Sequence, residues 1–165
     1  MTAQRTQTRA TPDAARLIAT GAVAPCSAAW AWLQVGPECL AAARAAVRGA
    51  LARWDLEAVA DEVTLMASEL AANACVHGAP PVTLRLELRT GPAGPVLTCE
   101  VTDAGPGRPA PAATPAGSEH GRGLAVVAAL ADEWGTRPRR PGTAAWFRLI
   151  VPAGTGPVSG KGRAA

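Results

Sequence analysis

The stretch Met66-Ala-Ser-Glu-Leu-Ala-Ala-Asn-Ala-Cys-Val-His77 combines the apolar pattern of a buried helix with one carboxylate and one carboxamide. Glu69 is the only charged residue between Val63 and Val76. Burying an ionised carboxylate is costly unless a partner compensates the lost hydration. Asn73 follows four residues later, which places it on the same helical face. The stretch therefore predicts a core helix on which these two side chains face a cation or a polar ligand.

The bulk composition limits the class of protein. A length of 165 residues predicts one domain with tails, and we expect no second catalytic domain within it. The formal net charge is +3, but the two termini hold more positive charge than this, so the middle of the chain is slightly acidic. The sequence pI near 9.0 is thus due to basic residues in the tails and does not predict a nucleic-acid-binding face.

The cysteines and lysines exclude several chemistries. The four cysteines, Cys26, Cys39, Cys75 and Cys99, form no CxxC pair, which argues against a zinc or redox motif. Most lie in apolar runs, which predicts reduced thiols that pack as small hydrophobic groups. Lys161 is the only lysine, so a Walker-type phosphate loop is excluded. Without a secretory apolar core or a run of about 20 apolar residues, we expect a soluble cytoplasmic protein that does not enter membranes.

Hydrophobic periodicity predicts one domain over 26–152, between a flexible tail over 1–25 and a disordered tail over 153–165. The expected fold is an α/β (α+β) two-layer sandwich, with a mixed, largely antiparallel sheet covered on one face by helices. Its predicted elements are strand 28–35, helices 38–53 and 56–77, strands 82–89 and 96–103, a glycine-rich loop over 104–122, helix 123–133, a basic turn over 137–142 and strand 144–151.

A second carboxylate falls where an apolar residue is expected. The alternation of strand 96–103 puts Asp103 on the buried face at the strand end, and Gly105 and Gly107 follow at once. A gap between helices and sheet suits a nucleotide, and an aspartate there can accept a hydrogen bond from the exocyclic amine of adenine. The glycines would let the backbone approach the base closely. We therefore expect an adenine site at Asp103.

The far end of such a nucleotide would meet a helix start. Gly121-Arg-Gly123 precedes the predicted helix 123–133, and its amides and helix dipole suit phosphate groups. Asn73 supplies a neutral oxygen for Mg²⁺, which takes few protein ligands besides phosphates and water. The loop before this helix is long enough to be a functional lid.

Three segments, in chain order, resemble the N, G1 and G2 boxes of the GHKL ATPase superfamily, which includes histidine kinases and Hsp90-type ATPases. They are Ser68-Glu-Leu-Ala-Ala-Asn73, Asp103-Ala-Gly-Pro-Gly107 and Gly121-Arg-Gly-Leu124. Within the superfamily the chain is most similar, from about Ala28 to Val151, to the single-domain anti-sigma-factor serine/threonine kinases. The resemblance implies an ATP lid between the glycine loop and the helix that follows it.

The resemblance also implies roles for individual residues. Glu69 would be the general base, Asn73 would hold Mg²⁺ and Asp103 would bind the adenine amine. The other implied ATP-binding residues are Gly105, Gly107, Gly121, Arg122, Gly123 and Leu124.

The expected activity is phosphorylation of an anti-anti-sigma (STAS-type) protein, which competes with a sigma factor for the kinase; the resemblance further implies a homodimer. An alternative is a binding module that holds ATP without appreciable transfer. It is favoured by Gly142-Thr-Ala-Ala, because Thr143 and Ala144 stand where the family often has Lys-Thr, and by Val76, where arginine is common. A third possibility, a structural domain without nucleotide, leaves two buried carboxylates without a ligand.

Overall fold

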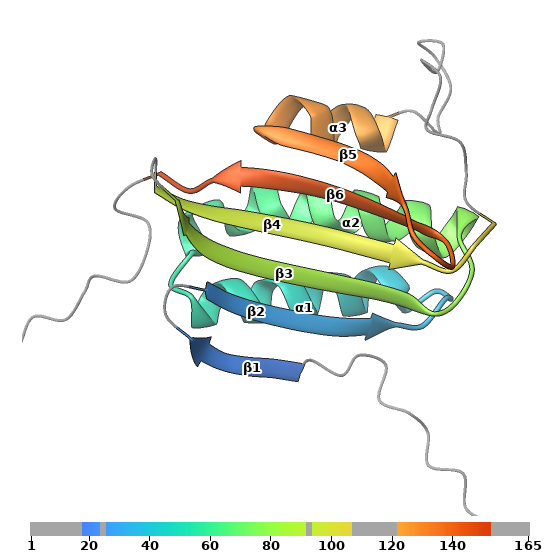
Figure 1. The fold of residues 1–165 in the computed structure, drawn as a ribbon, viewed down its shortest axis with the longest axis horizontal. Helices are drawn as coiled ribbons and strands as arrows, with labels where there is room; N and C mark the ends of the chain where they lie inside the picture. The colour runs from blue at the N-terminus through green and yellow to red at the C-terminus, as the bar shows by residue number, and fades with distance from the viewer. Residues whose placement is uncertain (1–17, 24–25, 92–93, 107–121, 153–165) are drawn as a thin grey trace, which may run out of the picture.

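The computed structural model describes residues 18–23, 26–91, 94–106 and 122–152. It has two layers, a six-stranded sheet with helices on one face (Figure 1). The strands are β1 (Ile18–Val23), β2 (Cys26–Leu33), β3 (Val82–Gly91), β4 (Gly94–Asp103), β5 (Glu133–Pro138) and β6 (Thr143–Ile150). The helices are α1 (Cys39–Arg53), the 3-10 helix η1 (Glu57–Val59), α2 (Ala60–His77) and α3 (Arg122–Leu130). The predicted two-layer α+β sandwich is confirmed.

The sheet has the strand order β1-β2-β3-β4-β6-β5, and neighbouring strands pair antiparallel at each of its five junctions. No parallel pair occurs among the described strands, so the mixed part of the prediction is not seen. The side facing the helices carries the apolar alternation expected for β3 and β4. Leu86, Cys99 and Phe147 stand opposite one another on three adjacent strands and are fully buried.

Two long helices cover this apolar side. Alanines such as Ala43 and Ala50 in α1 and Ala67 and Ala71 in α2 are fully buried, and such small side chains allow close approach of the two helices. The third helix, α3, packs against α2. Among the helices that the structure describes, none has the length and apolar character needed to cross a membrane.

Two edge strands differ from the prediction. The segment Ile18–Val23, predicted within a flexible tail, forms β1 and pairs with β2. The segment Glu133–Pro138, predicted as a helix end and basic turn, forms β5 and pairs with β6. Five of the six β5 residues are exposed, so the strand has no alternation of buried and exposed positions to reveal it.

The outer sheet face carries two carboxylates beneath arginines. Glu100 is 8% exposed and accepts hydrogen bonds from Arg137 and, at 3.0 Å, from Arg139. Glu87 is 5% exposed and pairs with Arg85 at 2.6 Å. The side chains of Arg137 and Arg139 are about half exposed, so water still reaches their guanidinium groups. Each carboxylate is therefore compensated by charge on the outer face of the sheet.

We expect Glu100→Ala to lower the free energy of unfolding by about 1–3 kcal/mol, because two arginines lose the buried acceptor that joins β4 to β5. Urea titration followed by circular dichroism measures this. The matched control is Glu133→Ala, which removes an exposed pair with Arg148 and should cost less than about 1 kcal/mol. Equal losses for the two variants would show that the Glu100 cluster contributes no more than a surface ion pair.

Candidate nucleotide site

Asp103 is held at the end of β4 by the turn that follows it. The backbone N–H of Gly105 donates to Asp103 Oδ1 at 2.8 Å, and the N–H of Ala104 donates to the carbonyl of Ala79 at 2.8 Å. Among the described residues, Asp103 Oδ2 has no hydrogen-bond partner. One carboxylate oxygen is thus fixed by the protein, while the other remains able to accept a hydrogen bond from a ligand.

Glycines surround this aspartate at distances that no side chain allows. A Cβ on Gly78, just after α2, would lie 2.6 Å from Asp103 Cγ. A Cβ on Gly142 would overlap the backbone carbonyl of Asp103, and Gly142 has a φ of +96°. A Cβ on Gly105 would lie 2.8 Å from Asp103 Oδ1. Gly78 and Gly105 therefore pack against the Asp103 side chain, and Gly142, from a distant part of the sequence, packs against its backbone.

Sheet register adds a hydroxyl to the same place. Thr143 is the residue opposite Asp103 in the β4–β6 pair, and opposite residues in an antiparallel pair carry side chains on the same face. Ala144, where the family often has threonine, pairs with Thr102 on the other face and is fully buried. The difference from the family pattern at Ala144 therefore falls on the side away from Asp103, and Thr143 supplies a polar group beside it.

Glu69 projects from α2 toward the start of α3. A Cβ on Gly123 would overlap Glu69 Oε2, so the carboxylate occupies space that only glycine leaves open. Glu69 is half-buried, and no cation pairs with it among the described residues. Within the described residues, no basic side chain is thus the partner that the sequence predicts for Glu69. The carboxylate faces a helix start, where backbone N–H groups point outward.

The remaining predicted residues divide into three groups. Asn73 is half-buried on α2, one turn after Glu69, and Leu124 packs partly buried against the core. Gly107 and Gly121, with most of the predicted lid, lie outside the described residues, as does the side chain of Arg122, although its backbone begins α3. The structure therefore brings together Asp103 with Gly105 and, separately, Glu69 with Gly123.

Helix α2 connects these two clusters. It carries Glu69 and Asn73 and ends at Gly78, which meets Asp103. From Glu69 to Gly78 the helical rise amounts to about 14 Å. An elongated ligand could therefore have one end at Asp103 and the other near α3, with Asn73 between them.

The polar groups at Asn73, Asp103 and the start of α3 suit a nucleotide with bound Mg²⁺. Among the described residues, no group of three or more His, Cys, Asp or Glu side chains could hold a metal ion by itself. A metal at Asn73 would take its other ligands from phosphates and water, as Mg²⁺ commonly does. The acceptor at Asp103 and the helix start at Gly123 suit an amine and an anion respectively.

Sequence reasoning missed Gly78 as a wall of the site and Thr143 as a polar neighbour of Asp103. Gly78 directly follows the predicted helix 56–77, and its contact with Asp103 cannot be recognised from the sequence pattern. Gly142-Thr143 belongs to the segment that differs from the family pattern, but the register of β6 against β4 is needed to place it beside Asp103.

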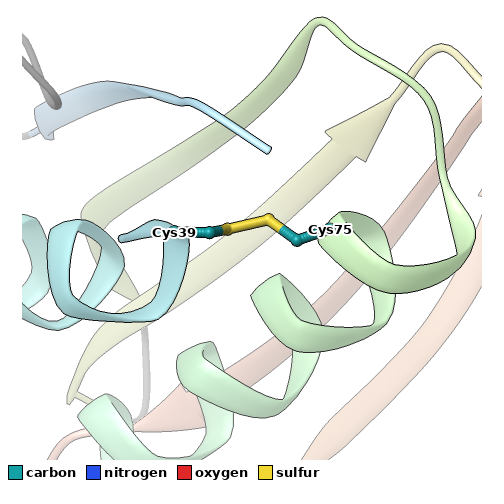
Figure 2. Close-up of a disulfide and its surroundings, with 2 residues drawn as sticks. All are labelled: Cys39 and Cys75. Atoms are coloured by element: carbon teal, nitrogen blue, oxygen red, sulfur yellow. A yellow bond between two sulfur atoms is a disulfide. The ribbon is translucent and has the colours of Figure 1, made fainter. Parts of the chain in front are cut away.

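The prediction of reduced thiols was wrong for Cys39 and Cys75, which form a disulfide (Figure 2). The pair could not be recognised from the sequence, because the two cysteines are 36 positions apart and the turn that brings the two helices together lies between them. Cys99 is a buried free cysteine, as predicted, and burial together with the neighbouring charge of Glu100 raises the pKa of its thiol. The side chain of Cys26 lies outside the described part of the structure.

The antiparallel sheet and its helical layer define a two-layer α+β sandwich, and the Asp103 and Glu69 clusters give it a candidate nucleotide site. Residues 33–149 match the histidine kinase-like ATPase domain family. Because the match spans well over half of the chain, the protein belongs to this family. Comparison with curated proteins finds no match. Domains of this GHKL type bind ATP, usually with Mg²⁺, and the chain is an ATP-binding module of that kind.

Proposed function

We propose that the protein is an ATP-dependent serine/threonine kinase of the anti-sigma-factor type that phosphorylates a STAS-type anti-anti-sigma partner. The observation that carries the proposal is the position of Glu69. Its carboxylate is half-buried, pairs with no cation among the described residues and faces the start of α3. A carboxylate in that position can accept the proton of an attacking hydroxyl group.

The proposed binding roles follow the two clusters. Asp103 would accept a hydrogen bond from the adenine amine through Oδ2, while Gly105 holds Oδ1 in place. Backbone N–H groups at Gly123 would donate to phosphate oxygens at the start of α3. Asn73 would hold Mg²⁺, which when bound neutralises charge on the phosphates. The proposal also includes four further ATP-binding residues, namely Gly107, Gly121, Arg122 and Leu124.

In the proposed transfer, the partner's serine or threonine oxygen forms a bond to the terminal phosphorus of ATP and ADP leaves. Glu69 receives the hydroxyl proton. The other residues act by positioning and charge neutralisation, since phosphoryl transfer asks little covalent chemistry of the protein. Phosphorylation of the partner would then determine whether the kinase binds that partner or a sigma factor. This exchange of partners would regulate transcription. Homodimerisation and a cytoplasmic location belong to the same proposal.

A binding module without transfer is the second candidate, and it rests on the altered segment Gly142-Thr-Ala-Ala. The structure reduces the weight of that observation. Ala144 lies on the sheet face away from Asp103, whereas Thr143 stands opposite Asp103. The loss of the usual threonine at Ala144 therefore does not remove a polar group from the face that carries Asp103.

We expect Glu69→Gln to bind Mg-ATP within about threefold of the wild type but to transfer phosphate at least about 100-fold more slowly, because it cannot accept the proton. Calorimetry measures binding, and incorporation of labelled phosphate into the partner measures transfer. Glu62→Gln is the matched control, because Glu62 is an exposed glutamate of the same helix. Equal incorporation by Glu69→Gln and wild type would remove Glu69 from the base role.

The partner is sought with a panel of purified STAS-type proteins and sigma factors, tested for binding with and without Mg-ATP. Each binder is then incubated with labelled ATP. Phosphate on a serine or threonine of a STAS-type binder supports the kinase. Nucleotide-dependent binding without incorporation into any binder would support the binding module instead.

A further inference from the structure

The Cys39–Cys75 disulfide joins the two covering helices at one end. Cys39 is the first residue of α1, and Cys75 lies in the last turn of α2, with a Cα–Cα distance of 6.8 Å (Figure 2). The Cys39 side is 1% exposed, whereas Cys75 is half-buried. The bond therefore lies at the edge of the core, where one of its sulfur-bearing residues remains accessible.

This disulfide anchors the last turn of α2, in which few side chains are buried. Ala74 is the last residue of α2 with a buried side chain, whereas Val76 is 72% exposed and His77 is exposed. Asn73 lies only two residues before Cys75. The covalent link to α1 thus fixes the part of α2 that carries the amide oxygen of the site.

The same turn leads directly into the wall of the Asp103 cluster. Gly78, three residues after Cys75, contacts the Asp103 side chain so closely that a Cβ would not fit. The carbonyl of Ala79 accepts the hydrogen bond from Ala104 that holds the following turn of the site. Any displacement of the end of α2 therefore changes both the Asn73 position and the contacts around Asp103.

We propose that Cys39 and Cys75 form a thiol–disulfide switch that controls nucleotide affinity. The disulfide holds α2 against α1 and keeps the site in its binding arrangement, and reduction releases the last turn of α2 and weakens Mg-ATP binding. The switch rests on the nucleotide site proposed above. It adds a form of regulation that depends on the redox state around the protein.

The chemistry is a thiol–disulfide exchange with a dithiol reductant. A thiolate of the reductant attacks the Sγ of half-buried Cys75, and the bond between the two protein sulfurs breaks. Cys39 leaves as a thiolate at the amino-terminal end of α1, where the helix dipole favours negative charge, and then takes a proton. The second thiol of the reductant releases Cys75, so the protein gains two thiols and the reductant becomes a disulfide. A low-molecular-weight disulfide reverses the exchange.

The test measures Mg-ATP affinity of the full chain by calorimetry in oxidised and dithiothreitol-reduced form. Thiol titration in denaturant establishes each form, because the oxidised protein should show two fewer reactive thiols than the reduced one. We expect reduction to weaken binding by about tenfold, a coupling of ordinary size between two sites. In parallel, amide hydrogen exchange over residues 74–79 should become faster on reduction, whether or not nucleotide is added.

Two variants separate the switch from other effects of the reductant. Cys39→Ala/Cys75→Ala should bind Mg-ATP with the weak affinity of the reduced protein and should not respond to dithiothreitol. Cys99→Ala, which removes the buried thiol outside the disulfide, should keep the tenfold response. Equal affinity and equal exchange in both redox states of the wild type would overturn the switch. Faster exchange on reduction, with no binding in either state, would instead contradict the nucleotide site.

Discussion

Asp103→Asn is expected to weaken Mg-ATP binding by at least about 100-fold, equivalent to about 3 kcal/mol, while the protein remains folded. The asparagine oxygen can still accept the hydrogen bond from Gly105, which Asp103 Oδ1 accepts in the structure. The new NH₂ group then replaces Oδ2 and points a donor at the adenine amine, which is also a donor. Isothermal titration calorimetry measures the loss of affinity, and the urea midpoint reports on the fold.

The same chemical change far from the site provides the control. Asp61 lies exposed in the first turn of α2, where it pairs with Arg48 at 2.9 Å. Asp61→Asn should leave the Mg-ATP dissociation constant unchanged, because it removes one carboxylate charge without touching the Asp103 cluster. An unchanged dissociation constant for Asp103→Asn would remove the adenine-binding role from this residue.

Gly142→Ala is expected to lower the free energy of unfolding by about 3 kcal/mol or more and to abolish nucleotide binding. The new Cβ would collide with the backbone carbonyl of Asp103, and the φ of +96° disfavours any residue with a Cβ. Relief of this collision requires the β5–β6 turn to move away from the end of β4. Urea titration measures the loss of stability, and calorimetry measures the loss of nucleotide binding.

Gly49→Ala is the matched control, because it makes the same substitution in the interior of α1. A Cβ there would approach only Arg53 Nη1, at 3.7 Å, so alanine should raise stability by up to about 1 kcal/mol. Opposite signs for the two alanine variants are therefore expected. A stabilising effect of Gly142→Ala would contradict the close contact between this turn and Asp103.

The parts of the fold that could be predicted are those with strong local patterns. The alternation of Leu84 and Leu86 with polar residues identified β3, and the apolar spacing around Met66 identified α2. The strand β5 has mostly exposed residues, so only its pairing with β6 reveals it. β1 is likewise defined by pairing with β2, which no local pattern of the sequence describes.

The candidate site shows the same division. Asp103 and Glu69 could be singled out because each is a carboxylate at a position that its own element would bury. Gly78 and Gly142 gave no such signal, because their role depends on contacts with Asp103 across large sequence separations. The disulfide was missed for the same reason. Small residues and remote pairs act through three-dimensional proximity, which residue type and spacing do not encode.

The strand order β4-β6-β5 has a consequence for how the protein becomes active during folding. Asp103 obtains its neighbours Thr143 and Gly142 only when β6, the last described strand, has paired with β4. Contacts between residues so distant in sequence form slowly, because a long loop must close first. A chain in which β6 has not yet paired with β4 therefore cannot assemble this end of the nucleotide site. ATP binding would accordingly add its binding energy only to molecules in which β6 has paired with β4.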